Sequence, residues 1–129
     1  MNQEIHAELQ RAHETVRAAQ QLVSSGFIVD AISRAYYAVL HAAQAALLQR
    51  NIRAGSHRAL RALFGQHLVK TGLIEKEFAV ILRKEAEDRE LSDYQADVTL
   101  SAEVAAQRVR EAEQFVARIE QWLKEQFST

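Results

Sequence analysis

The stretch VDAISRAYYAVLHAAQAALLQ, residues 29–49, decides the fold of this chain. When it is drawn as a helix, apolar side chains lie nearly all round it, and a helix of this kind is enclosed by neighbouring elements. Its many alanines have small side chains, which allow neighbouring helices to approach closely. We therefore predict that residues 29–49 form the central helix of a helical protein.

Four further helices are predicted on either side of this segment, over residues 3–25, 56–70, 75–90 and 101–126. In the first and the last of them, apolar residues recur at alternating steps of four and three positions, which is the spacing of one buried helical face. Asn2, Ser56 and Ser101 stand where a side chain caps the first turn of a helix, and Gly26 stands where a helix ends. Residues 91–100 are mostly polar and are expected to be irregular.

The expected fold is all-α: an up-and-down four-helix bundle with an additional short helix, formed by residues 1–129 as a single domain. The chain has no proline and four glycines, which suits a protein that is helical almost throughout. No segment alternates with a period of two residues for long enough to predict a strand.

The composition narrows the classes of function. The formal net charge is −1, so we expect no attraction of the whole chain to nucleic acid, although a local basic patch is compatible with this charge. The absence of cysteine excludes disulfides, thiol nucleophiles and cysteine metal ligands. The five histidines lack the spacing of a metal site, so no metal and no other cofactor is expected. No signal peptide or membrane-spanning run is visible, which predicts a cytoplasmic protein without membrane contact.

A polar stripe interrupts the apolar surface of the predicted central helix. Asp30, Arg34, Tyr37, His41 and Gln44 are spaced by four and three positions and therefore lie on one face. The simplest interpretation is that this face meets water, and the alternatives are a polar groove or a wet seam between two subunits. Arginine, tyrosine and histidine bind anions and stack on bases, which favours a functional groove.

Arg89 lies on the same side of its helix as the apolar Phe78, so it points into the bundle or along its edge. One explanation is structural: an arginine near a helix C-terminus is favourable, and Glu85 is its natural partner one turn earlier. The other is functional, because Arg89 is followed closely by Asp93 and Tyr94, beside the start of the last helix, where anions are favoured.

Several segments resemble one family. Residues 31–43 (AISRAYYAVLHAA) are similar to the second helix of small prokaryotic HEPN-domain proteins. Residues 55–57 (GSH), 64–74 (FGQHLVKTGLI) and 89–94 (RELSDY) continue the resemblance, which covers nearly the whole chain. The SRAYYA and SDY runs are its most specific parts.

This resemblance implies a helical bundle that forms a homodimer. Many HEPN domains act as metal-independent ribonucleases through an arginine that is followed a few residues later by a histidine. Small members often pair with a minimal nucleotidyltransferase in toxin–antitoxin modules. All of these properties are expectations from the resemblance.

The chain departs from the family's ribonuclease motif. Arg89 corresponds to the motif arginine, but Tyr94 stands where the histidine is expected, and no histidine follows Arg89. Histidine suits proton transfer at neutral pH, whereas tyrosine is a poor base. Arg89 retains the ability to hold a phosphate, and Asp93 is able to orient it or accept a proton. His41 or His57 is a possible source of the missing imidazole, within one chain or across a dimer.

The function expected from these observations is a homodimeric HEPN-domain protein that binds RNA or nucleotide phosphate and acts with a nucleotidyltransferase partner in a toxin–antitoxin type module. The predicted catalytic group is Arg89, Asp93 and Tyr94. The predicted nucleotide-binding residues are Arg34, Tyr37, His41 and His57. Two alternatives remain: an active metal-independent ribonuclease toxin, and a non-catalytic module that binds other proteins.

Overall fold

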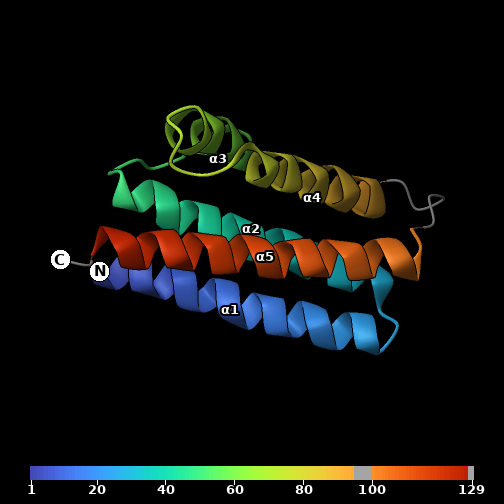
Figure 1. Cartoon of the computed structure of the whole chain (residues 1–129). Helices are drawn as coiled ribbons and strands as arrows, with labels where there is room; N and C mark the ends of the chain where they lie inside the picture. The colour runs from blue at the N-terminus through green and yellow to red at the C-terminus, as the bar shows by residue number, and fades with distance from the viewer. Residues whose placement is uncertain (95–99, 128–129) are drawn as a thin grey trace.

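The computed structural model describes residues 1–94 and 100–127, without the side chains of residues 92–94. Its elements are α1 (Gln3–Ser24), α2 (Ile28–Gln49), α3 (His57–Phe64), the π-helix η1 (Gly65–Val69), α4 (Lys76–Tyr94) and α5 (Ala102–Gln126). The long helices α1, α2, α4 and α5 run alternately up and down, and the short α3 lies beside the start of α4 (Figure 1). The predicted all-α bundle with an additional short helix is confirmed.

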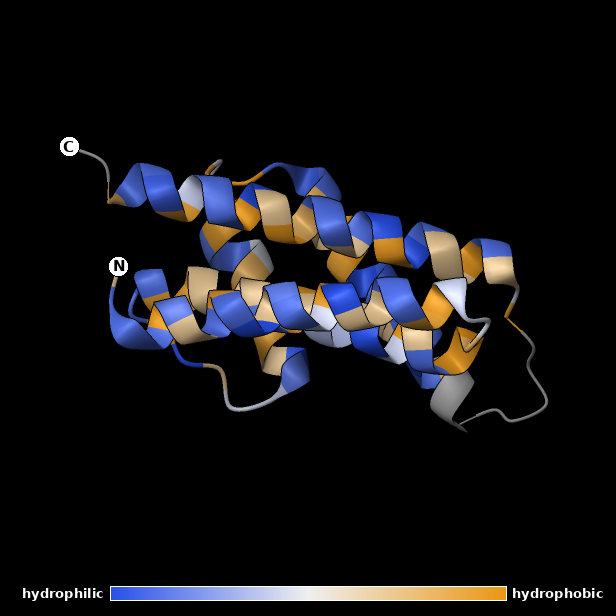
Figure 2. Ribbon diagram, turned by 90° about the horizontal axis from the view of Figure 1, so that it is seen from below, coloured by the Kyte–Doolittle hydropathy of each residue, from blue (hydrophilic) through white to orange (hydrophobic). Residues whose placement is uncertain are grey.

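The helix α2 is the centre of the bundle, as predicted. It packs against α1, α3, η1, α4 and α5. The side chains without any exposed surface cover about half of its circumference, and the polar stripe of Arg34 and His41 lies outside this arc. They are Ala31, Ile32, Ala35, Ala38, Val39, Ala42, Ala43, Ala45 and Ala46. Figure 2 shows hydrophobic residues gathered on the helix faces that are turned toward one another. Seven of these nine residues are alanine, so the neighbouring helices approach α2 closely.

The predicted helix ends are present. Asn2 Oδ1 accepts a hydrogen bond from the Ile5 amide at 2.8 Å, and Ser101 Oγ accepts one from the Val104 amide at 3.1 Å. Gly26 follows α1 with a φ of 83°, a left-handed conformation that glycine adopts without steric cost. Because four long antiparallel helices bring the chain back to its starting side, α1 begins and α5 ends at the same end of the bundle (Figures 1 and 2).

An aromatic cluster holds the short helix in place. Phe64 at the end of α3 lies against Phe115 of α5 with ring centroids 5.4 Å apart, and Phe78 of α4 lies 6.1 Å from Phe115. Phe64 and Phe115 are completely buried. Such aromatic pairs stabilise a core beyond the area they bury. The cluster therefore fixes α3 against the bundle, and with it His57, the first residue of α3.

Two details differ from the sequence expectations. The helix expected over residues 75–90 continues as α4 to Tyr94, so the first part of the expected irregular segment is helical, while residues 95–99 lie outside the described part. Ser92 and Asp93 lower helix propensity by only a few tenths of a kcal/mol each, which does not end a helix. The helix expected over 56–70 widens into the π-helix η1 after Phe64.

Ionisable side chains are largely buried between α4 and α5. Arg108 of α5 forms ion pairs with Asp88 of α4 and with Glu111, and the three side chains are 16%, 14% and 12% exposed. Glu85 of α4 lies near them and has no exposed surface. The expected ion pair of Glu85 with Arg89 does not form, because neither carboxyl oxygen of Glu85 has a hydrogen-bond partner in the part of the chain described.

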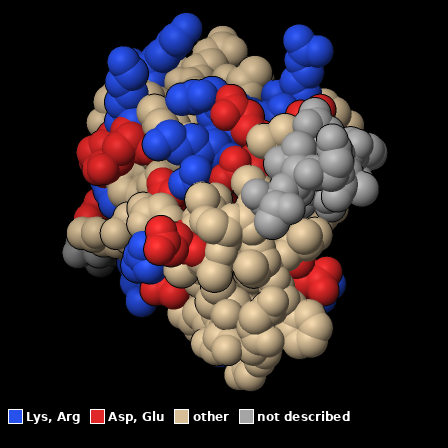
Figure 3. Space-filling model, turned by 90° about the vertical axis from the view of Figure 1, so that its right-hand side faces the viewer, with Lys and Arg blue, Asp and Glu red and all other residues tan. Residues whose placement is uncertain are grey.

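One area at the end of the bundle where α1 turns into α2 carries few charges. Figure 3 looks at this end and shows intermixed positive and negative side chains above an area with few charged groups. Phe27 and Val29, which belong to this turn, are 57% and 49% exposed. No helix in the described part is both long and apolar enough to cross a membrane.

Candidate phosphate-binding site

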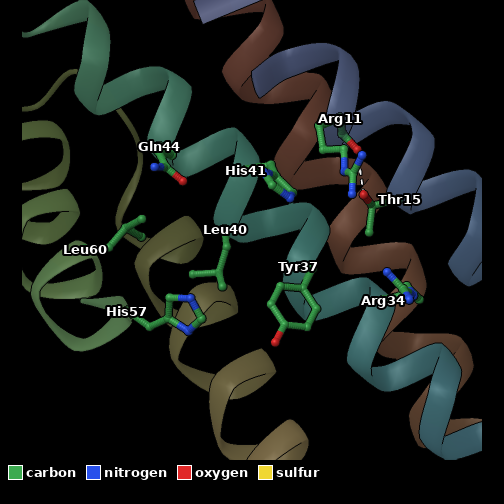
Figure 4. Close-up of a pocket in the computed structure, with 9 residues that line it drawn as sticks. All are labelled: Arg11, Thr15, Arg34, Tyr37, Leu40, His41, Gln44, His57 and Leu60. Carbon is green, nitrogen blue, oxygen red and sulfur yellow. Dashed lines mark hydrogen bonds between the residues drawn. The ribbon is translucent and has the colours of Figure 1, made fainter. Parts of the chain in front are cut away.

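A cavity of about 330 Å³ opens between α1, α2 and the start of α3 (Figure 4). The residues that line it are Arg11, Thr15, Arg34, Tyr37, Leu40, His41, Gln44, His57 and Leu60. Four of the five residues in the predicted polar stripe are among them, and Asp30 is not. The stripe therefore faces a concave surface that three helices share, and not only open water.

The structure brings together all four residues that were predicted to bind a nucleotide. Arg34, Tyr37 and His41 reach the cavity from α2, and His57 reaches it from α3. In Figure 4, His57 lies on one side of the cavity and Arg34 on the other, with Tyr37 and His41 between them. Their role in binding stays a prediction.

The ring of His41 is oriented by a carboxylate. Its Nδ1 lies 2.7 Å from Glu8 Oε2, and the two side chains are 28% and 23% exposed. A carboxylate has no proton to donate, so Nδ1 carries the proton of this hydrogen bond. The Nε2 atom has no hydrogen-bond partner among the described residues, so it is available to a ligand in the cavity.

Two arginines bring positive charge to the cavity. Arg11 comes from α1 and Arg34 from α2, and both side chains are exposed. Neither forms an ion pair within residues 1–94 and 100–127 as described. Guanidinium groups with this freedom are suited to bind the oxygens of a phosphate.

Arg89 points into the bundle, as its position on the helix predicted. Its Nη2 donates a hydrogen bond to Tyr37 Oη at 3.0 Å, and its Cζ lies 5.6 and 5.3 Å from the ring centroids of Tyr36 and Tyr37. Arg61 of α3 donates in the same way to Tyr36 Oη at 3.1 Å. Two neighbouring tyrosines of α2 thus each hold one arginine from another helix.

His57 completes a cluster of aromatic rings. Its ring centroid lies 5.8 Å from that of Tyr36 and 6.2 Å from that of Tyr37. Burial lowers the pKa of His57, and the positive charges of Arg89 and Arg61 lower it further. The imidazole is therefore neutral at pH 7 and able to accept a proton.

The remaining predicted catalytic residues are less fully described. The backbone of Asp93 and Tyr94 belongs to the last turn of α4, and their side chains lie outside the described part. Arg89 does not line the 330 Å³ cavity itself but reaches its wall through Tyr37. The described residues contain no group of three or more His, Asp or Glu side chains that could hold a metal ion.

Sequence reasoning missed Glu8 and Arg11. Together with Thr15 they are spaced by three and four positions along α1, so they form a second polar stripe that the sequence does contain. The sequence alone does not show which helix this stripe faces. Only the packing of α1 against α2 places it opposite Arg34 and His41.

Comparison with known proteins agrees with the resemblance seen in the sequence. The family model described as "HEPN domain" matches residues 5–124. The chain is 37% identical to "Putative toxin MJ0605" of Methanocaldococcus jannaschii over 97% of this chain and 92% of that protein. It is 34% identical to "UPF0332 protein PH1297" of Pyrococcus horikoshii over 70% of this chain and 63% of that protein. A "UPF0332 protein" of Thermotoga maritima is 30% identical over 89% of this chain and 87% of its own length.

Proposed function

Since the chain belongs to the HEPN domain family, we propose that it is a toxin-like HEPN protein that binds the phosphate groups of RNA or of a nucleotide in the cavity between α1, α2 and α3. The observation that carries the proposal is the convergence of Arg11 and Arg34, from two helices, on one concave surface. Their side chains form no ion pair with described residues, so a phosphate meets guanidinium groups that no carboxylate neutralises.

The other residues of the cavity suit the rest of a nucleotide. The rings of Tyr37 and His57 offer surfaces on which a base stacks. Gln44 and the free Nε2 of His41 are polar groups that form hydrogen bonds with a sugar or base. The cavity thus combines charge for phosphate with rings for bases, as proteins that bind single-stranded nucleic acid do.

Binding is tested by fluorescence anisotropy with a labelled single-stranded RNA and with mononucleotides. Arg34→Ala removes one guanidinium from the cavity and is expected to weaken RNA binding about tenfold, which corresponds to about 1.4 kcal/mol. The matched control is Arg83→Ala, since Arg83 is exposed and pairs with Glu87 on the surface of α4. Equal affinities of the two variants would exclude the cavity as the binding site.

The proposal extends to a homodimer that works with a nucleotidyltransferase in a toxin–antitoxin type module. The family membership and the relative whose name contains the word toxin support it. Sedimentation of the purified protein should give twice the mass of one chain. Co-purification with a minimal nucleotidyltransferase encoded beside it should give a stable complex. If the purified protein is a monomer and does not retain the nucleotidyltransferase, the extension is contradicted.

A second candidate function, metal-independent cleavage of RNA, is favoured by the two imidazoles in one cavity. Neutral His57 would take the proton of a ribose 2′-hydroxyl, whose oxygen then attacks phosphorus. The bond from phosphorus to the 5′-oxygen breaks, and that oxygen receives a proton from Nε2 of His41, whose ring Glu8 holds in position. The products are a 2′,3′-cyclic phosphate and a 5′-hydroxyl.

Incubation of RNA with the purified protein in EDTA tests this candidate. His57→Asn and His41→Asn are each expected to lower the cleavage rate at least about a hundredfold, since each removes one proton-transfer group. Glu8→Gln should lower it less, because His41 remains. The matched control is His67→Asn, since His67 lies in η1 and does not line the cavity. If the RNA stays intact with the unmodified protein, the cleavage function is excluded and only the proposed binding remains.

A further inference from the structure

A groove separate from the candidate phosphate site lies between α3, η1 and the start of α4. It has a volume of about 1000 Å³ and shares no described lining residue with the 330 Å³ cavity. The short α3 and the start of α4, which form its two sides, lie next to each other in Figure 1. The residues that line it are Arg61, Ala62, Gly65, Gln66, Val69, Lys70, Lys76 and Ala79.

The lining of the groove is mostly small and apolar. Ala62, Gly65 and Val69 are spaced by three and four positions, so they share one face of the helical run formed by α3 and η1. Ala79 lines the groove from α4. Such side chains leave room for the apolar side chains of a ligand. No aromatic ring belongs to the described lining, so a nucleic-acid base finds no surface for stacking here.

Gly65 keeps part of this lining open. Its φ of −60° and ψ of −44° are right-handed helical values that every residue adopts readily. A Cβ atom added at Gly65 would meet no atom within 4 Å. Glycine disfavours a helix, so neither the backbone conformation nor a neighbouring atom explains its presence. A glycine does allow another molecule to approach the backbone closely.

Positive side chains stand at both ends of the apolar lining. Lys70 and Lys76 are exposed on either side of the turn that joins η1 to α4. Arg61 precedes Lys70 by nine residues, which corresponds to roughly 13 Å along a helix. Neither lysine forms an ion pair within the ranges that the structure describes, and no described lining residue is acidic. The groove is therefore complementary to a ligand with carboxylates at both ends and apolar groups between them.

We propose that this groove is a docking site for an acidic amphipathic helix of a partner protein. Its apolar face would lie against Ala62, Gly65 and Val69, and its carboxylates would meet Arg61 and the two lysines. A helix fits better than an extended segment, because the groove is formed by helices and offers no strand edge for pairing. The proposal does not depend on phosphate binding, since the two sites have no described lining residue in common.

Fluorescence anisotropy with a labelled synthetic peptide tests the docking site on the full chain. The probe is a helix of about 14 residues, or four turns, with leucines along one face and glutamates beside them. Lys76→Glu brings a carboxylate to the groove and is expected to weaken peptide binding at least about tenfold. The matched control is Lys84→Glu, since Lys84 is exposed on the same helix and does not line the groove. A peptide with lysine in place of each glutamate should not bind.

A neutral substitution separates docking in the groove from attraction to any positive surface. Gly65→Gln adds a bulky polar side chain to the lining and should also weaken binding of the acidic peptide at least about tenfold. It should not lower the melting temperature, because glutamine favours a helix and its Cβ meets no atom. The matched control is Gly55→Gln, since Gly55 lies before α3, outside the groove, and a Cβ there also meets no atom within 4 Å.

Three results would overturn the docking site: no binding of the acidic peptide, equal binding of the acidic and basic peptides, or equal effects of a groove variant and its control. If Lys76→Glu weakens the binding of labelled single-stranded RNA and not that of the peptide, the groove takes nucleic acid and the assignment to a protein helix is wrong. Arg34→Ala changes the other cavity and should leave peptide binding unchanged, so failure of one proposal is distinguishable from failure of the other.

Discussion

The pKa of the Glu85 carboxyl group is set by the surroundings of that side chain in the fold. It is completely buried on α4, and neither oxygen has a hydrogen-bond partner among the residues described. Burial raises the pKa of Glu85 to about 9, and the nearby positive charge of Arg108 offsets only part of this effect. Glu85 is therefore a neutral acid at pH 7, which avoids the large cost of a buried charge.

The raised pKa of Glu85 predicts how stability changes with pH. Between about 4.5 and about 9 the folded protein keeps a proton that the unfolded chain releases, so the free energy of unfolding falls as pH rises through this range. The loss is up to about 1.4 kcal/mol per pH unit. Glu85→Gln stays neutral and should remove this slope, as urea unfolding at about pH 6 and about pH 8 would show.

The matched control for this prediction is Glu87→Gln, because Glu87 is an exposed neighbour on the same helix. It should keep the pH dependence of the unmodified protein. If Glu85→Gln and the unmodified protein lose stability equally between the two pH values, the carboxyl of Glu85 is not the group responsible.

At the scale of the elements, the alanine-rich α2 sets the spacing of the bundle. Its buried alanines leave no room for larger side chains. We expect Ala46→Leu to lower the free energy of unfolding by about 1–3 kcal/mol, because a larger side chain forces the adjacent helices apart. Ala62→Leu on the exposed face of α3 is the control and should change stability by less than about 0.5 kcal/mol. Thermal unfolding of both variants measures the difference, and equal melting temperatures would argue against tight packing at Ala46.

The elements also show what the sequence predicts and where prediction ends. The apolar steps, the capping residues Asn2 and Ser101 and the short loops predicted the helices and their order, because these signals are local. The stripe of Arg34 and His41 was found in the same way, since both lie on one helix. The partners that complete the site come from other helices: His41 meets Glu8, 33 residues earlier. That pairing depends on how two helices are aligned, and no local pattern encodes it.

The same distinction holds for Arg89. Its inward direction followed from its place on α4, beside Phe78. Its hydrogen bond to Tyr37 joins residues 52 positions apart in the sequence. The bond forms only if α4 packs against α2 with these two residues at the same level along the bundle axis. One of the two explanations for Arg89, an ion pair with Glu85, does not hold, because helical spacing gives only proximity. Glu85 is buried, and neither of its carboxyl oxygens has a hydrogen-bond partner among the described residues.

At the scale of the whole molecule, the positive and negative charges nearly balance, so any strong charge is confined to small areas of the surface. The chain has a formal net charge of −1, and Figure 3 shows both signs intermixed on the face it presents. Attraction to nucleic acid is therefore expected near the 330 Å³ cavity, to which Arg11 and Arg34 bring positive charge. Stacking on the rings of Tyr37 and His57 requires bases that are not already stacked in a duplex.

This arrangement predicts a preference for single strands. Duplex RNA of the same length should compete at least about tenfold less well than single-stranded RNA for the site, because its bases are not free to stack on Tyr37 and His57. Competition measured by fluorescence anisotropy gives the ratio directly. Equal competition by both forms would mean that the rings take no part in binding.

Because α1 begins and α5 ends at the same end of the bundle, the fold has a practical consequence. A linker that joins the two ends would close the chain into a ring, and a new start opened at the turn before α2 would give a circularly permuted polypeptide. Arg11 would then reach its cavity from a helix that no longer precedes α2. A permuted molecule that keeps its ligand would establish that helix packing, and not chain order, assembles the pocket.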